Sequence, residues 1–503
     1  MFNVSKGWMT GFPRNFLFPI VLALLGFAPS TSPAAPAPAA QPIPHATFLA
    51  ACHRAGIDEK ALCGTYEVYE DRKARAGRKI ALNVVVLPAI ETSAPDPVFW
   101  LHGGPGAAAT DLVGEASGGF LERLHRRHDL VFVDQRGTGA SNGLQCDLGD
   151  DPADLRSFFG PLLPADKIRA CRRKLEKIAN LKLYTTPIAM DDLDDVRAAL
   201  GYDRIDLVAA SYGTIAALVY MRQHAEHVRA VFLAGVANTN VRQPLPFAPA
   251  AQHAMEMLFV DCAADASCHE AFPRLREEFA AVLQRFDKGA VTATLTNPET
   301  REPQSVSIAR GNFVERLRLL LYTTTFARYV PWIVHSAYQG DFLPFESLSI
   351  QYNPGAILAR GMYLTVTCSE SIPFITEADI RKETSGTFLG DYRVRIHEQA
   401  CKEWPRGDIP RSYVEPVTSS VPVLMISGEL DGSVTPGLGA DALSHLRQGR
   451  QVKIRYYGHQ VDDPCVWRLL SDFIDTADAA KVDTTCTEQI RRPSFPKELS
   501  VQF

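Results

Sequence analysis

One serine stands where its hydroxyl could act as a nucleophile. Ser211 follows the apolar, β-branched run Ile205–Val208 and precedes the stretch Ile215–His224, which predicts a helix. A serine at such a sharp strand-to-helix turn has its hydroxyl exposed at the edge of the sheet, beside backbone N–H groups that can bind an oxyanion. Gly213 fits the turn, and Ala209 stands where the pattern has its first glycine. The segment therefore predicts a nucleophile elbow, with an ordinary surface turn as the alternative.

Two glycine-rich loops precede this serine. His102–Gly106 follows the strand-like Pro97–Leu101, and Asp134–Ser141 follows a second strand-like run. The glycines after His102 let a backbone N–H approach a reacting carbonyl without a side chain in the way. A phosphate-binding loop is the alternative, but no Lys-Ser/Thr pair follows and no G-x-G-x-x-G is present. We predict that the N–H groups of Gly104 and Tyr212 form the oxyanion hole.

The motifs HGGPG, DQRGTG and SYGT, in this order and at this spacing, resemble those of the proline iminopeptidase and tripeptidyl aminopeptidase group of α/β-hydrolases. The resemblance covers nearly the whole chain after residue 40, and Ala209 is its visible departure. It implies an α/β-hydrolase fold, in which a mostly parallel sheet carries helices on both faces and a mainly helical cap domain is inserted. It also implies a serine peptidase that acts at the amino end of short peptides.

The other members of a catalytic triad should follow in the order acid, then histidine. The buried-strand pattern Val421–Gly428 precedes Asp431, the position at which the resembled family carries its acid. Glu429 lies closer to the strand end and is the competing acid. His459 follows a further strand, Val452–Tyr457, and a glycine, so its ring can fold back over the serine while the acid holds its other nitrogen. This chemistry needs no metal or organic cofactor.

The resemblance also implies that acidic side chains from the cap hold the free amino terminus of the substrate. Glu370, two residues after Cys368, matches that kind of segment. A carboxylate that faces an ammonium group makes a strong contact and fixes its geometry. A surface glutamate, or one paired with a structural arginine, is the alternative. The expected partner is therefore a short peptide with a free amino terminus.

The amino-terminal residues have the pattern of a secretory signal. Lys6 and Arg14 make the start positive, Phe16–Phe27 is a short apolar core, and Ala28–Ala40 is rich in alanine, proline and serine without a charge. The apolar core is too short for a spanning helix. We predict export to the periplasm or the outside of the cell, with no stable membrane insertion after the signal is removed. An uncleaved membrane anchor is the alternative.

Cysteine usage also favours an oxidising compartment. The ten cysteines fall into five pairs of neighbours in sequence, which suits local disulfides because closing a short loop costs the least entropy. A zinc site is a weaker reading, since no C-x-x-C pair occurs, and a reduced cytosolic enzyme is a second alternative. The expected disulfides are Cys52–Cys63, Cys146–Cys171, Cys262–Cys268, Cys368–Cys401 and Cys465–Cys486.

The organisation of the chain agrees with one inserted domain. We expect a signal and linker over residues 1–40, the first half of the hydrolase core over 41–240, the cap over 241–419 and the second half of the core over 420–503. Met190–Leu200 has a helical apolar stripe that ends at Gly201 and leads into the strand before the serine. A net charge of −5 and the lack of basic runs give no indication of nucleic-acid binding.

Three functions remain open at this point. The favoured one is an exported serine aminopeptidase. An esterase or lipase is the alternative within enzymes, because a triad handles esters and amides alike. A catalytically inactive, hydrolase-like binding protein is the third. The sequence leaves the oligomeric state open.

Overall fold

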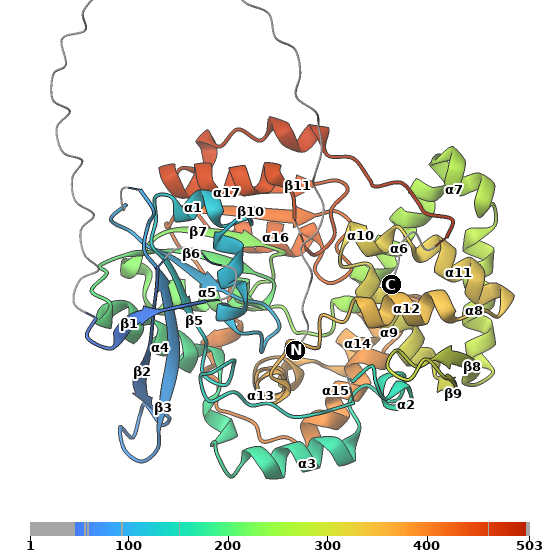
Figure 1. The fold of residues 1–503 in the computed structure, drawn as a ribbon, viewed down its shortest axis with the longest axis horizontal. Helices are drawn as coiled ribbons and strands as arrows, with labels where there is room; N and C mark the ends of the chain where they lie inside the picture. Colours follow the sequence, from blue (N-terminus) through green and yellow to red (C-terminus); the bar gives the residue numbers. More distant parts are fainter. Residues whose placement is uncertain are drawn as a thin grey trace, which may run out of the picture. The chain divides into compact units, whose positions relative to one another are not determined.

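One mixed sheet of nine strands organises the residues that the computed structural model describes, which are 46–54, 57, 60–91, 94–149, 151–460 and 462–498. The strand order is β1-β2-β3-β5-β4-β6-β7-β10-β11 (Figure 1). The first three strands pair antiparallel to their neighbours, and those from β5 to β11 run parallel. The strands are β1 Leu49–Cys52, β2 Ala61–Tyr69, β3 Lys79–Leu87, β4 Val98–Leu101, β5 Leu130–Val133, β6 Ile205–Ala210, β7 Val228–Ala234, β10 Val423–Gly428 and β11 Gly449–Ile454.

Helices cover both faces of this sheet, as the strand period requires. Along β4, Phe99 and Leu101 join one apolar core, whereas Val98 and Trp100 join the other. Side chains of a strand alternate between faces, so two apolar faces need two covering layers. One layer holds α3 Ala165–Leu175, α4 Thr186–Ala199, α5 Tyr212–Gln223 and α13 Arg360–Glu370; the other holds α1 Glu122–His125, η1 Ala109–Ala116 and α17 Pro464–Thr476. The predicted α/β-hydrolase fold is confirmed.

The middle of the chain builds a separate apolar core, which is the cap. Its helices are coloured green to yellow in Figure 1 and pack on one another through residues between Phe247 and Leu348. The cap is mainly helical, but it also contains an antiparallel hairpin of β8 Val291–Thr296 and β9 Pro303–Ile308. Its helices are α6 Phe247–Ala264, α7 Ala266–Ala271, α8 Leu275–Asp287, α9 Arg310–Leu320, α10 Thr324–Ala327, α11 Val330–Gln339 and α12 Leu343–Gln351.

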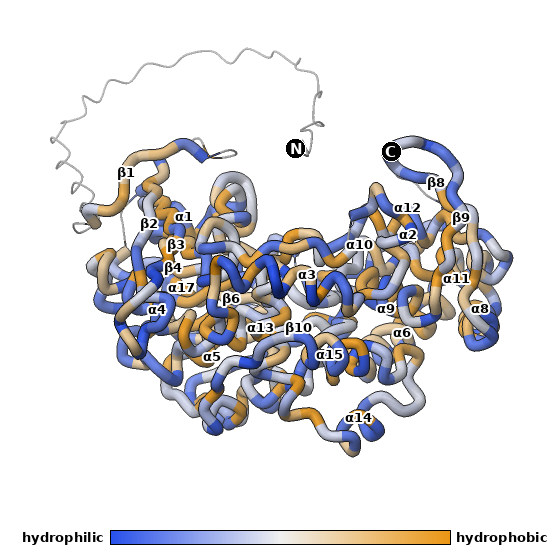
Figure 2. The backbone as a smooth tube through the Cα atoms, turned by 90° about the horizontal axis from the view of Figure 1, so that it is seen from below, coloured by the Kyte–Doolittle hydropathy of each residue, from blue (hydrophilic) through white to orange (hydrophobic). Residues whose placement is uncertain are grey.

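The segment expected to form the cap, 241–419, contributes helices both to the cap's core and to one layer that covers the sheet. Met362 and Leu364 of α13 pack into the sheet's own core, whereas Phe345 and Leu348 of α12 belong to the cap's core. Helix α3 carries mostly hydrophilic residues, and its backbone is coloured accordingly in Figure 2. The remaining helices are α2 Leu155–Phe158, α14 Glu377–Thr384, α15 Tyr392–Lys402 and α16 Pro436–Leu443, with short 3-10 turns at η2 Leu181–Leu183, η3 Ala225–His227, η4 Ile372–Phe374, η5 Arg411–Val414, η6 Ala479–Lys481 and η7 Thr485–Gln489.

All ten cysteines lie in the described part of the chain and form disulfides. The structure joins each cysteine to the neighbour with which the sequence analysis pairs it. The signal expected over residues 1–40 lies outside the described residues. Within the described part, no helix combines the length and the apolar character that crossing a membrane requires.

Candidate active site

Ser211 occupies a strained turn between β6 and α5. Its backbone angles are φ 57° and ψ −126°, a conformation that a non-glycine residue adopts only when its surroundings enforce it. Close packing does so here: a Cβ at position 213 would lie 2.1 Å from the carbonyl oxygen of Leu101, and one at position 103 would lie 3.0 Å from the Cβ of Ser211. Gly213 and Gly103 therefore let the serine sit against the end of β4. Ala209 is buried in the sheet core, so its methyl group is accommodated.

Ser211, His459 and Asp431 form one chain of hydrogen bonds. Nε2 of His459 lies 2.8 Å from the Ser211 hydroxyl oxygen, and Nδ1 lies 2.8 Å from Oδ2 of Asp431. A carboxylate oxygen only accepts, so Nδ1 carries the ring proton and Nε2 presents its lone pair to the hydroxyl. The structure thus brings together the three residues that the sequence analysis selected, although they are up to 248 positions apart in sequence.

Asp431 is fixed from its other side. Its Oδ1 accepts the backbone N–H groups of Ser433, at 2.7 Å, and Val434, at 3.0 Å. The competing acid, Glu429, uses its backbone N–H to extend the pairing with β11, through the carbonyl of Ile454. Among the described residues, no hydrogen bond joins its side chain to the histidine. Only Asp431 can therefore orient the ring.

Tyr322, a cap residue that the sequence analysis missed, supports His459. The ring of Tyr322 packs against the imidazole at 4.8 Å between centroids, and its carbonyl accepts the N–H of Gln460 at 3.0 Å. The Tyr322 hydroxyl also reaches the Ser433 hydroxyl at 3.3 Å. No sequence signal marks Tyr322, because its role depends on how the cap folds over the core. By contrast, the turn at Asp431-Gly432-Ser433 is a local pattern in which an aspartate accepts N–H groups two and three residues ahead.

Two backbone N–H groups are placed for the predicted oxyanion hole. Tyr212 is the first residue of α5, so its N–H has no acceptor within the helix. Gly103 donates its N–H to Nδ1 of His102 at 2.7 Å, which leaves the N–H of Gly104 as the donor of this loop. Burial lowers the pKa of His102 to about 4, so its ring is neutral and can accept. His102 therefore shapes the loop.

The second glycine-rich loop holds the active-site loops in place. Both oxygens of Asp134 accept hydrogen bonds: one from the N–H of Thr110 in η1 at 3.0 Å, and the other from the N–H of Ala140 in its own loop at 3.2 Å. Ser141 is fully buried, and its hydroxyl oxygen accepts the N–H of Asn83 at 2.8 Å. This loop is structural, and Ser141 has no access to a substrate.

The structure does not bring Glu370 to the triad, so its expected contact with a substrate ammonium group needs correction. One oxygen accepts the N–H of Thr186 at 2.6 Å, and the other accepts the hydroxyls of Thr186 and Tyr413. The Thr186 hydroxyl lies 2.6 Å from that of Tyr212. Glu370 is not among the residues that line the cavity at the triad; it borders a separate void of about 10 Å³, room for no more than one water. The oxygens of Glu370 are therefore occupied by contacts within the protein. Through Thr186 and Tyr212, the carboxyl group supports the turn at Ser211.

This position predicts a pH effect on stability. Burial raises the pKa of Glu370 from 4.5 to about 7, so the folded protein keeps a proton that the unfolded chain releases. The free energy that this bound proton adds to the folded state is fully present below pH 4.5 and is lost as the pH rises to about 7. Glu370→Gln should remove about 3 kcal/mol from the pH dependence of the unfolding free energy over this window. Urea unfolding of both proteins from pH 4 to 8 measures the difference; parallel curves would contradict it.

The triad opens into a cavity of about 410 Å³ between the core and the cap. Aromatic side chains of the core, such as Trp100, Phe120 and Phe232, line one part, and polar side chains of the cap, such as Glu315 and Arg393, line another. The volume falls in the range of small-molecule sites. The cavity can therefore hold a small substrate with both apolar and charged groups.

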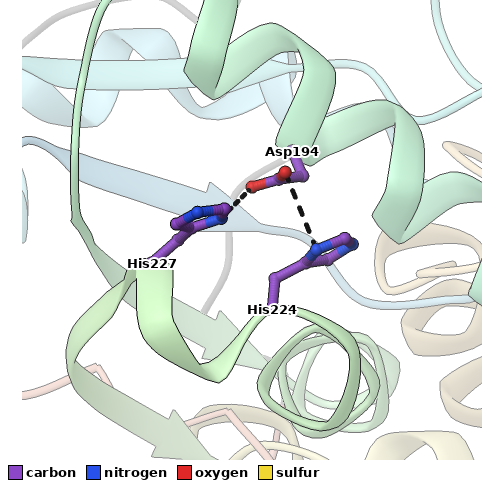
Figure 3. A group of neighbouring side chains, drawn as sticks. All are labelled: Asp194, His224 and His227. Carbon is purple, nitrogen blue, oxygen red and sulfur yellow. Dashed lines mark hydrogen bonds and ion pairs between the residues drawn. The ribbon is translucent and has the colours of Figure 1, made fainter.

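A second cluster of titratable side chains lies on the sheet's helices, away from this cavity. Asp194, His224 and His227 come close enough to hold a metal ion (Figure 3), with Nδ1 of His227 2.8 Å from one Asp194 oxygen and Nδ1 of His224 3.6 Å from the other. The carboxylate, however, already accepts hydrogen bonds from Arg197 at 2.7 Å and Tyr220 at 2.8 Å. The arginine supplies the charge that a metal would bring. We therefore interpret the cluster as a structural contact between α4 and the segment that follows α5.

Comparison with known proteins matches residues 96–461 of the chain to the family described as alpha/beta hydrolase fold. Among curated relatives, serine protease Hip1 of Mycobacterium tuberculosis is 29% identical over 225 residues, which cover 41% of this chain and 42% of Hip1. Tripeptidyl aminopeptidase of Streptomyces lividans is 28% identical over 35% of each chain. Proline iminopeptidase of Neisseria gonorrhoeae is 28% identical over 29% of this chain and 35% of the relative.

The matched regions thus span less than half of the length of these relatives. A solved proline iminopeptidase of Mycobacterium smegmatis aligns over 83% of this chain and 99% of its own length at 15% identity, with a TM-score of 0.35. The family match covers more than half of the sequence and agrees with the sheet, the elbow and the order of serine, acid and histidine. The chain belongs to the alpha/beta hydrolase family, and its curated relatives include serine peptidases by name.

Proposed function

We propose that this hydrolase is an exported serine aminopeptidase, which releases residues from the amino end of short peptides. The observation that carries the proposal is the chain of two 2.8 Å hydrogen bonds from Asp431 through His459 to Ser211, at the wall of a cavity. A hydroxyl paired with an oriented imidazole is the arrangement that nucleophilic acyl transfer requires.

The proposed reaction proceeds through an acyl-enzyme. The Ser211 oxygen attacks the peptide carbonyl while Nε2 of His459 takes the hydroxyl proton. The N–H groups of Gly104 and Tyr212 hold the negative oxygen of the tetrahedral intermediate. When the C–N bond breaks, the histidine gives its proton to the departing amine. Water, deprotonated by the same nitrogen, then cleaves the ester and restores the serine.

The peptidase assignment rests on the kind of relative that the chain matches. Hip1, tripeptidyl aminopeptidase and proline iminopeptidase are all peptidases by name, whereas the triad alone would serve an esterase equally well. We therefore keep an esterase as the second candidate. The strained serine and the ordered triad favour an enzyme over an inactive binding protein, because strain of this kind persists at sites that use it.

The amino group of the substrate needs an acidic partner other than Glu370. Glu115, Glu315 and Asp462 are the carboxylates that line the cavity. Glu315 is bonded to arginines, whereas neither of the other two forms an ion pair with a described residue. Of these two, Glu115 is half-buried and lies on η1, directly after the glycine-rich loop of the oxyanion hole. We propose Glu115 as the ammonium partner.

Export is proposed on two observations. The charged start, apolar core and small-residue stretch of residues 1–40 fit a signal peptide. Five disulfides are typical of proteins that fold in an oxidising compartment. Short peptides with a free amino terminus are the proposed partners, and the proposed reaction needs only water besides the groups of the protein.

One panel of substrates tests the proposal. Purified protein should cleave Pro-, Ala- and tripeptidyl-coumarin amides, and acetylating their amino ends should lower kcat/KM by about 10- to 100-fold, the scale of a lost charge-assisted hydrogen bond. Glu115→Gln should lower the rates with free amines to a similar degree and spare neutral p-nitrophenyl esters. Glu122→Gln, on the neighbouring helix α1, is the matched control. Equal cleavage of free and acetylated amides would refute the aminopeptidase and leave the esterase as the candidate function.

A further inference from the structure

Two arginines share one glutamate on the cap wall of the cavity. Glu315 and Arg318 lie on α9 and Arg393 on α15, and all three line the cavity. Arg318 donates to both oxygens of Glu315, at 3.0 and 2.5 Å, and Nη1 of Arg393 lies 3.2 Å from one of them. The side chains of Glu315 and Arg318 are 2% and 1% exposed, and that of Arg393 is 13% exposed. Arg393 is therefore the member of the cluster that is open to the cavity.

This cluster carries an unbalanced positive charge in the interior. Burial alone would raise the pKa of Glu315, but the charges of Arg318 and then Arg393 outweigh burial and lower it. Burial alone would lower the pKa of Arg393, but the charge of Glu315 in turn raises it, so both groups stay charged. The neighbouring His397 adds no charge, because burial lowers its pKa to about 3. Two cations thus face one anion. Buried charge is unfavourable unless an opposite charge reaches it, so the cluster favours the binding of one more anion.

Arg393 also has donors that the protein does not use. Its Nη2 donates to the Tyr363 hydroxyl at 3.0 Å, and its Nε is buried without a partner among the described residues. The Tyr363 hydroxyl donates in turn to Nε2 of His397 at 2.7 Å, whose Nδ1 donates to the carbonyl oxygen of Arg393 at 2.6 Å. These contacts hold the guanidinium group in one place. A group that is held with unused donors is prepared for a ligand.

The cluster is close to the reacting bond. Nη1 of Arg318 donates to the Tyr322 hydroxyl at 2.7 Å, and the ring of Tyr322 packs on the imidazole of His459 at 4.8 Å between centroids. One tyrosine side chain therefore separates the cluster from the triad. An anion at Arg393 would belong to the molecule whose carbonyl lies at the serine.

We propose that Arg393 binds a carboxylate group of the substrate. The planar fork of a guanidinium group matches the two oxygens of a carboxylate, and a charged pair in a buried site fixes both position and register. The carboxylate is either an acidic side chain near the scissile bond or the free carboxyl end of a very short peptide. The inference rests on the proposed function of Ser211 and adds a preference for acidic or very short peptides.

The test compares kcat/KM for substrates that differ only by a carboxylate. The pairs are Glu against Gln at each of the first three residues of a tetrapeptide, a free carboxyl end against its amide, and p-nitrophenyl hemiglutarate against p-nitrophenyl pentanoate. The wild type should favour the acidic member of at least one peptide pair by about 10- to 100-fold. The pair that shows the preference identifies the side chain or the carboxyl end as the source.

Variants assign the preference to one residue. Arg393→Gln should bring the ratio within each pair close to one, and Arg393→Lys should keep part of it because a point charge remains without the fork. Arg395→Gln is the matched control on the same helix, since this arginine pairs with surface acids such as Glu377. If Arg393→Gln does not fold, Arg393→Lys still tests the proposal. A partial loss of the preference for the acidic substrate in Arg393→Lys would support the carboxylate site, and an unchanged preference would overturn it.

Two further outcomes separate this inference from the proposed function. Equal rates within every pair, or a preference that survives in Arg393→Gln, would overturn the carboxylate site while leaving peptide cleavage intact. A preference seen only with the hemiglutarate ester and removed by Arg393→Gln, without cleavage of any peptide, would support the carboxylate site and refute the aminopeptidase.

Discussion

Ser211→Ala is expected to reduce turnover by about 10⁴- to 10⁶-fold, because removal of one triad member disables the triad as a unit. The hydroxyl forms no hydrogen bond with a described side chain other than that of His459, so folding should be unaffected. Steady-state hydrolysis of a free-amine peptide amide and of p-nitrophenyl acetate measures the loss. Circular dichroism checks that the variant retains the wild-type structure.

Ser141→Ala is the control for this variant, because Ser141 is the other serine in a glycine-rich motif. Its buried hydroxyl accepts the N–H of Asn83, so its loss should cost about 1 kcal/mol of stability while turnover stays near that of the wild type. Near-normal turnover by Ser211→Ala, or a collapse of turnover in Ser141→Ala at full folding, would refute the assignment of the nucleophile.

Asp431→Asn is expected to lower kcat by about 10⁴-fold, which is the scale of an asparagine replacing a triad aspartate elsewhere. The amide can donate to Nδ1, and the histidine would then hold its proton on Nε2, where it can no longer accept the serine proton. The effect should fall on amides and esters alike, since both need the same proton transfer. Measurement of kcat with each substrate class tests this expectation.

Glu429→Gln provides the matched control for the acid. Glu429 lies two residues before Asp431, but only its backbone takes part in the sheet and its side chain does not reach the histidine. Its replacement should change kcat by less than about threefold, because among the described residues its half-buried side chain forms no hydrogen bond with the triad. A large loss in Glu429→Gln with a small one in Asp431→Asn would reverse the roles of the two acids.

The parts of the site that the sequence could predict are those set by local chemistry. The strand and helix on either side of Ser211 follow from apolar periodicity, and β6 and α5 lie where these patterns predict them. Helix α4 begins at Thr186, four residues before the predicted start at Met190, because Pro187 fits the first turn of a helix and extends it. The fold class was also predictable, since its motifs are contiguous segments.

The parts that the sequence could not predict depend on contacts between distant segments. Glu370 was expected to face the substrate, but α13 packs on the sheet and turns its carboxylate towards Thr186. The hairpin β8–β9 lies in the segment that was expected to be mainly helical. Tyr322 and Arg393 gain their neighbours only when the cap folds over the core, so no local pattern identifies them.

The central claim is that Ser211 is the nucleophile of an enzyme that recognises free amino termini. A peptidyl diphenyl phosphonate with a free amino end tests both parts, because the serine oxygen displaces phenol and forms a stable bond to phosphorus. The mature protein is treated with this reagent and with its acetylated twin, and digested with trypsin. The adduct should appear on the peptide covering residues 205–222, which contains Ser211, and should form about 10-fold faster or more with the free amine. An adduct on another residue, or equal rates for the two reagents, would contradict the account.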